Sequence, residues 1–231
     1  MHKSSMIRMQ WFKENYLCKL DKDHIKMVAD IGSQCVPGQK YSYKTLFNEP
    51  WFKYTGLDMI EGHNVEIVLN NVYKWDEVSE DFCDVLISGQ VFEHVEFPWF
   101  TIQEMARILK PNGLLCIIVP SMQRMHRHPV CCQNYFSDGL IALAKYAGLE
   151  VLHASTNCAP PRAKIEWYNK FQDSMLIASK PTHWNPNTFD KQNYTCVPAD
   201  LEKMATGLIP MSKLPKYKQY IIKINNKVRS I

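Results

Sequence analysis

Two acids, Asp30 and Asp58, lie at or near the ends of short apolar segments of this 231-residue chain. Asp30 lies in an apolar segment that begins at Met27 and breaks at Gly32 and Ser33, and Asp58 ends the next such segment. An acid at the carboxyl end of the second strand of a parallel α/β sheet is where the ribose hydroxyls of a bound nucleoside lie. The spacing of these acids therefore predicts a ribose-containing ligand.

The glycines around the first acid narrow the ligand class. A dinucleotide fold needs the pattern G-x-G-x-x-G, so that the backbone can approach a pyrophosphate at a helix N-terminus. Here Gly32 stands alone until Gly38. A single glycine after an acid better suits a ligand that carries a cationic amino-acid tail and no phosphate. An NAD(P)-dependent oxidoreductase on a Rossmann sheet remains as an alternative.

Alternating apolar periodicities predict an α/β domain that positions these residues. A short helix is also expected within residues 38–47, and Pro111-Asn112-Gly113 is expected to stop the second long helix with a left-handed cap. The expected strands begin at residue 27 and cover residues 53–58, 65–69, 84–88, 114–119, 150–154 and 174–178, and the expected helices cover 6–20, 99–110 and 137–147.

Several motifs occur together in one order and spacing over roughly residues 27–180. They are Asp30-Ile31-Gly32-Ser33, Tyr54-Thr55-Gly56-Leu57-Asp58, Phe82 to Ser88, Glu93-His94, and Glu104 to Gly113 with its Leu-Lys-Pro-Asn-Gly ending. In this combination the chain resembles the class I S-adenosylmethionine-dependent methyltransferases. The resemblance implies a Rossmann-like seven-stranded, mostly parallel sheet with helices on both faces and the last strand antiparallel.

The resemblance also implies roles for individual residues in binding S-adenosyl-L-methionine. Gln34 and Val36 stand where the family usually has its second and third glycines, which leaves the local path of this loop open. The implied cofactor residues are Asp30, Gly32 and Ser33 at the methionine end, Asp58 on the ribose hydroxyls, Asn71 at the adenine edge, and Ser88, Gly89 and Gln90 facing the methyl sulfonium and the acceptor.

Residues of the loop after the fifth strand are expected to face the methyl acceptor, because loops at the carboxyl ends of the strands form the site in this topology. These acceptor residues are Arg124, Arg127, His128 and Tyr135. The arginines would suit an anionic acceptor such as a phosphate or a uronic acid. An alcohol acceptor also needs a base, and we predict His94 or His126 for this role. The pair His126-x-His128 lacks a third ligand, so no metal site is expected.

The resemblance is to a large bacterial subgroup with small-molecule, lipid or sugar acceptors. We therefore expect methyl transfer to an oxygen or nitrogen of a small molecule or of a surface-glycan precursor, as in polysaccharide biosynthesis. A second alternative is a non-catalytic, methyltransferase-like binding module, which would be expected to have lost Asp58 or the first motif. Both are largely present in this chain.

The composition and charge of the chain limit its possible binding partners and indicate its cellular location. The six cations and no acids of residues 211–231 account for more than the net charge of +4, which leaves the rest of the chain slightly acidic. Nucleic-acid binding is therefore disfavoured, and the tail suggests at most weak contact with a membrane surface. Eight cysteines without a visible signal peptide indicate a cytoplasmic protein. We expect a helical extension over 1–26, a cofactor-binding domain over 27–181 and an irregular basic extension over 182–231; the oligomeric state stays open.

Overall fold

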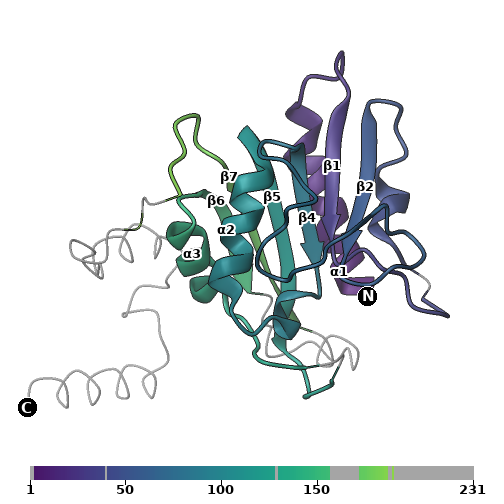
Figure 1. Ribbon diagram of the computed structural model, residues 1–231, viewed down its shortest axis with the longest axis vertical. Helices are drawn as coiled ribbons and strands as arrows, with labels where there is room; N and C mark the ends of the chain where they lie inside the picture. Colours follow the sequence, from purple (N-terminus) through teal and green to yellow (C-terminus); the bar gives the residue numbers. More distant parts are fainter. Residues whose placement is uncertain (1–2, 40, 128–129, 157–171, 187–188, 190–231) are drawn as a thin grey trace, which may run out of the picture. The chain divides into compact units, whose positions relative to one another are not determined.

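A computed structural model describes residues 3–39, 41–127, 130–156, 172–186 and 189, which belong to one compact unit, Met1–Phe189. Seven strands form one sheet in the order β3-β2-β1-β4-β5-β7-β6 (Figure 1). The strands are β1 Lys26–Ile31, β2 Phe52–Asp58, β3 Ile67–Val68, β4 Cys83–Gly89, β5 Leu109–Met122, β6 Glu150–Thr156 and β7 Gln172–Ser179.

The strand directions confirm the predicted sheet. The pairs β1–β2, β1–β4, β2–β3 and β4–β5 are parallel, whereas β7 is antiparallel to both β5 and β6. The chain order reverses at β1, which has β2 on one side and β4 on the other. In open α/β sheets the ligand crevice lies at such a switch point, outside the carboxyl ends of the strands.

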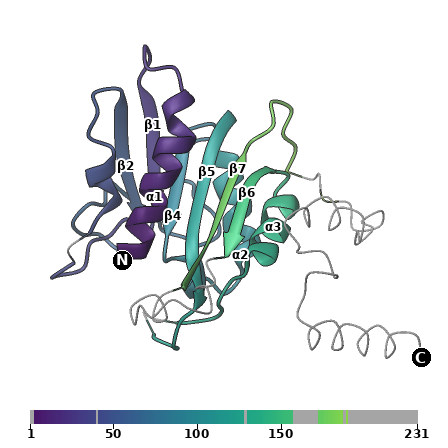
Figure 2. The ribbon, with the colours of Figure 1, turned by 180° about the vertical axis from the view of Figure 1, so that it is seen from behind.

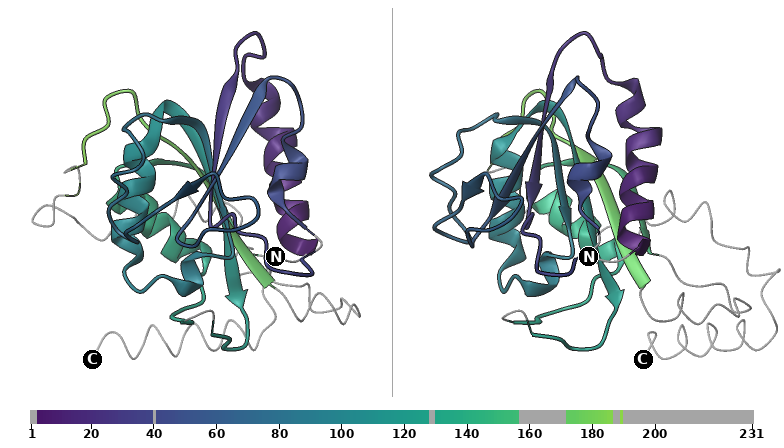
Figure 3. Two further views of the ribbon diagram at one scale, coloured as in Figure 1. Left: turned by 45° about the vertical axis from the view of Figure 1, so that its right-hand side comes forward. Right: turned by 90° about the vertical axis from the view of Figure 1, so that its right-hand side faces the viewer.

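Helices cover both faces of the sheet, as expected. Helix α1, Lys3–Asn15, lies on one face (Figure 2), and α2, Pro98–Ile108, and α3, Ser137–Tyr146, lie on the other (Figure 3). Two buried apolar clusters result: Met9 and Phe12 of α1 pack on one face, and α2 and α3 pack on the other. A strand covered on both faces reads as a continuous apolar run, which explains why the strands could be found in the sequence.

The expected helix stop at Pro111-Asn112-Gly113 is wrong. Helix α2 ends at Ile108, and β5 begins at Leu109, so these three residues lie within the bounds of β5, at an irregularity in its pairing with β4. Asn112 does have positive φ, at 63°, but its amide donates to the carbonyl of Lys180, and the Lys180 amide donates to the carbonyl of Gly113. Pairing with a segment 70 residues away overrides the local capping signal.

The crossover from β1 to β2 contains a single turn of 3₁₀ helix, η2, Tyr43–Leu46, within the described residues. The expected short helix over 38–47 is thus confirmed in place and shortened. Two further 3₁₀ turns are η1, Leu17–Lys19, after α1, and η3, Phe92–His94, after β4. Among the described residues, the helices are too short or too polar to span a bilayer.

Candidate cofactor and acceptor site

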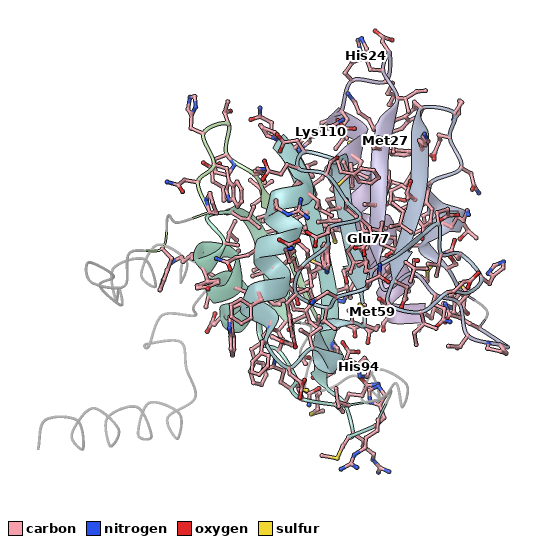
Figure 4. The ribbon with its side chains drawn as sticks, viewed as in Figure 1. His24, Met27, Met59, Glu77, His94 and Lys110 are labelled. Carbon is pink, nitrogen blue, oxygen red and sulfur yellow. The ribbon has the colours of Figure 1, made fainter. Side chains whose placement is uncertain are left out.

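The predicted site residues gather at the edge where the parallel strands end. Figure 4 shows His94 and Met59 at this edge, and Met27 and Lys110 at the opposite one. The turn after β1 lies against the turn after β4 at the switch point: a Cβ atom placed on Gly32 would lie 2.1 Å from Cγ2 of Val91. Gly32 has φ of +78°, so both its backbone conformation and its close contact require glycine.

Asp30 is the most deeply buried acid of the β1 turn, with 2% of its surface exposed. The Tyr54 hydroxyl donates to its Oδ2 at 2.5 Å, and Asn64 Nδ2 lies 3.0 Å from that hydroxyl. Asn64 Nδ2 also donates to the carbonyl of Ser33 at 2.9 Å, and Ser33 Oγ donates back to the Asn64 carbonyl at 2.8 Å. A polar network spanning β1, β2 and the next loop therefore fixes the first motif.

Burial raises the pKa of Asp30 from 3.8 to about 7, and the nearby charges of Asp58 and Glu66 add to this rise. The hydrogen bond from Tyr54 opposes it. No ion pair to Asp30 forms within the described part of the chain. A buried carboxyl without a cation favours a positively charged ligand, because such a ligand would stabilise the ionised form.

Asp58 ends β2 beside this network and is partly exposed. Its Oδ2 accepts from the amide of Gln34 at 2.9 Å, and its Oδ1 accepts from the amide of Met59 at 2.7 Å. These bonds hold the loop after β1 to the end of β2. Oδ1 also accepts from the amide of Ile60 at 3.4 Å, whereas Oδ2 accepts from Gln34 alone among the described residues and keeps a lone pair for a ligand hydroxyl.

The end of β4 supplies the opposite wall. Ser88 Oγ donates to the carbonyl of Ile31 at 3.1 Å, which ties β4 to β1. A Cβ on Gly89 would lie 2.1 Å from the Tyr43 hydroxyl, so η2 closes directly on this position. Gln90 has φ of 62°, a strained conformation for a residue with a side chain, and such strain often accompanies a functional role.

A second buried acid, Asp173 at the start of β7, meets Gln90 at this wall. Gln90 Nε2 donates to Asp173 Oδ1 at 3.1 Å, and Ser4 Oγ of α1 donates to Oδ2 at 2.7 Å. The Ser5 and Tyr43 hydroxyls are hydrogen-bonded beside it at 2.5 Å. The Oε1 atom of Gln90 is buried and accepts no hydrogen bond from the described residues, so a ligand donor fits here.

The structure brings the two predicted bases together. The ring centroids of His94, on η3, and His126, in the loop after β5, are 5.0 Å apart with the planes at 84°. The Nδ1 atom of His94 donates to the carbonyl of Val130 at 2.5 Å. Glu93, 1% exposed, places Oε1 3.8 Å from His94 Nε2, and burial raises the pKa of its carboxyl to about 7.

The remaining predicted residues are spread more widely. Arg124 and Arg127 are exposed on the loop after β5, and His128 lies outside the described residues. Tyr135 is 6% exposed and donates its hydroxyl to the Phe92 carbonyl at 3.3 Å, so its side chain packs into the core beneath the loop. Asn71 is exposed, and its Oδ1 accepts from the amide of Tyr73 at 2.8 Å.

Sequence reasoning missed Tyr43, Tyr54, Asn64 and Asp173. The usable signal was at Asp173, an acid that opens an apolar strand. Because β7 is antiparallel, its first residues lie at the edge where the parallel strands end. The two tyrosines and the asparagine carry no such signal, because their contacts depend on the path of the loops.

Residues 46–117 match the protein family described as a methyltransferase domain. None of the curated proteins matches the chain. Among solved structures, 1,6-didemethyltoxoflavin-N1-methyltransferase from Burkholderia thailandensis, with bound 1,6-didemethyltoxoflavin and S-adenosylhomocysteine, is 16% identical with a TM-score of 0.56, over 78% of this chain and 79% of that one.

Two further structures share the fold. An S-adenosylmethionine-dependent methyltransferase from Aquifex aeolicus is 17% identical, with a TM-score of 0.51 over 75% of this chain and 92% of that one. The [4+2]-cyclase SpnF is 15% identical, with a TM-score of 0.56 over 76% and 81%. The chain thus contains a segment that matches a methyltransferase domain, within a fold shared with solved S-adenosylmethionine-dependent methyltransferases.

Proposed function

We propose that the protein transfers a methyl group from S-adenosylmethionine to an oxygen or nitrogen of a small molecule or a surface-glycan precursor. The observation that carries this proposal is that Asp30 and Asp58 lie near the carboxyl ends of the adjacent strands β1 and β2. Asp30 is buried without an ion-pair partner among the described residues, which suits a cationic ligand. Asp58 lies where ribose hydroxyls bind in this topology.

The residues present fit this cofactor, which when bound supplies an electrophilic methyl group on a sulfonium. Asp58 would accept both ribose hydroxyls, and Asn71 would meet the adenine edge. The methionine end would lie on Asp30, Gly32 and Ser33. Ser88, Gly89 and Gln90 would line the side that faces the methyl group and the acceptor, where Gln90 Oε1 is available as a buried acceptor of hydrogen bonds.

The acceptor is proposed to lie under the loop after β5. His94 or His126 would take the acceptor's proton while the new carbon–oxygen or carbon–nitrogen bond forms and the carbon–sulfur bond breaks. Orientation for this in-line displacement supplies most of the rate. Arg124 and Arg127, with His128 on the same loop, would bind an anionic acceptor, and Tyr135 would hold the loop from below.

Calorimetric titration of the full chain with S-adenosylmethionine, S-adenosylhomocysteine and NAD tests the donor. We expect both sulfur ligands to bind and NAD not to bind. Asp58→Ala should weaken both by tenfold or more, on the order of the 1.4 kcal/mol that corresponds to that factor. Asp76→Ala, an exposed acid on the next loop, is the matched control.

The titration separates the competing functions. Binding of NAD alone would favour an oxidoreductase. Unchanged affinity in Asp58→Ala would contradict the proposed ribose site. If the sulfur ligands bind, incubation with labelled S-adenosylmethionine and candidate sugars or metabolites searches for the acceptor, and failure of every His94 and His126 variant to alter turnover would remove both histidines as bases.

A further inference from the structure

Glu93, His94 and His126 bring three metal-ligating groups to one place at the site edge. One carboxylate oxygen and one nitrogen from each imidazole lie within 4.8 Å of one another. Glu93 and His94 belong to the turn after β4, and His126 belongs to the loop after β5. We propose that these three side chains form a binding site for a divalent transition-metal ion of the zinc type.

Hydrogen bonds to backbone carbonyls orient both imidazoles. Nδ1 of His94 lies 2.5 Å from the carbonyl of Val130, and Nδ1 of His126 lies 3.2 Å from the carbonyl of Arg124. A carbonyl only accepts, so Nδ1 is the donor in each of these bonds, and Nε2 is the ring nitrogen that would bind the ion. Metal-ligating histidines are commonly held in this way by a carbonyl behind the ring.

Glu93 supplies the charge that a cation would neutralise. It is 1% exposed, and its Oε2 accepts no hydrogen bond from the described residues. Burying a carboxylate without a partner is costly, and coordination to a metal is one of the ways in which proteins offset that cost. Its Oε1 already lies 3.8 Å from His94 Nε2.

The donor set suits zinc, which binds imidazole nitrogen, carboxylate oxygen and thiolate. Ligands that share one zinc ion lie about 3.5 Å apart, so the side chains would close by about 1 Å on binding. Three protein ligands leave one position open, as in catalytic zinc sites.

The ion would fasten the acceptor loop to the sheet. Besides the contact of His94 with Val130, the Cys132 amide donates to the Glu93 carbonyl at 2.7 Å, and Gln133 Nε2 donates to the Val95 carbonyl at 3.4 Å. With the ion bound, His94 and His126 would be ligands and would not act as bases. The open position would then hold the acceptor hydroxyl and lower its pKa, so that its proton passes to solvent, a role that rests on the proposed function.

The full chain, stripped with a chelator, can be titrated with zinc sulfate by calorimetry and with cobalt chloride by visible absorption. We expect one ion per chain, and at least about 100-fold weaker binding in Glu93→Gln and His126→Asn. His24→Asn and Cys18→Ser, both at exposed positions, are the controls for adventitious imidazole and thiol binding.

Absence of stoichiometric binding, or equal affinity in Glu93→Gln and His126→Asn, would overturn the metal site. Circular dichroism of each variant shows whether it is folded, and His94→Asn provides an independent third variant should one of them fail to fold. S-adenosylhomocysteine is titrated into the same samples. If S-adenosylhomocysteine binds but neither zinc nor cobalt does, only the metal site is refuted. If the metal binds but S-adenosylhomocysteine does not, only the cofactor proposal is refuted.

Discussion

Asp30 is a buried carboxyl whose pKa is raised to about 7 by desolvation, so its charge changes within an accessible pH range. A cationic ligand stabilises the ionised form, and the affinity for S-adenosylmethionine should therefore rise about tenfold between pH 6 and 8. S-adenosylhomocysteine keeps the same α-ammonium at its methionine end and should gain about as much. Calorimetry across this range measures both, and Asp30→Asn should make the affinity nearly independent of pH. An equally steep rise in that variant would show that another group is responsible.

The same residue should also affect stability. Between its ordinary pKa of 3.8 and about 7, the folded form keeps a proton that the unfolded chain has released. The free energy of unfolding should thus fall as the pH rises through this window and level off above it. In urea titrations, Asp30→Asn should match the native protein near pH 4 and be more stable than it at pH 8. A native protein that gains stability from pH 5 to 8 would argue that other groups outweigh Asp30 and Glu93.

At the scale of elements, the contact between the β1 and β4 turns depends on Gly32. Gly32→Ala adds the cost of positive φ and a clash with Val91, and it should destabilise the fold by about 2 kcal/mol or more. Gly38→Ala is a matched control, because Gly38 has φ of +80° with no atom within 4 Å of its Cβ position. Chemical denaturation should give a smaller loss for Gly38→Ala, of about 1 kcal/mol.

Adding Val91→Ala to Gly32→Ala separates the two contributions. The double variant should recover the part due to the clash and keep the part due to the backbone. Equal losses for Gly32→Ala and Gly38→Ala would mean that the two turns do not pack as described.

The elements that could be predicted are those whose sequence pattern reflects two-sided burial or amphipathicity. Strands β4, β6 and β7 and helix α3 fall where their apolar periodicity indicated. The pattern Pro111-Asn112-Gly113 was misread because a capping signal and a strand that pairs with distant residues look alike locally. The strand expected over residues 65–69 is shorter in the structure, because only Ile67 and Val68 pair with β2.

At the scale of the whole molecule, α1 forms one of the three layers. Phe12 is fully buried between α1 and the sheet, so Phe12→Ala should cost about 3–5 kcal/mol in thermal or urea unfolding. Trp11 on the same helix is 38% exposed, and Trp11→Ala should cost clearly less. Similar losses for the two would indicate that α1 is held mainly by its outer side.

Only part of the arrangement of the site could be predicted from the sequence. Asp30, Asp58 and the end of β4 follow the strand-end rule, so their position at one edge of the sheet could be predicted from the sequence. The pairing of His94 with His126, and the meeting of Ser4, Gln90 and Asp173, depend on how distant segments are folded together. No local pattern carries that information.

The hydrogen bonds on Asp173 have a consequence for how the protein is made. Ser4 and Asp173 are 169 positions apart, and Gln90 and Asp173 are 83 apart. A nascent chain that has reached Pro120 already contains every residue proposed for the cofactor, yet the wall of the site opposite Gln90 has not been synthesised. Contacts of such long sequence separation form late, because the loop-closure entropy must be overcome first. The donor site should therefore be among the last parts to form, after β7 has left the ribosome.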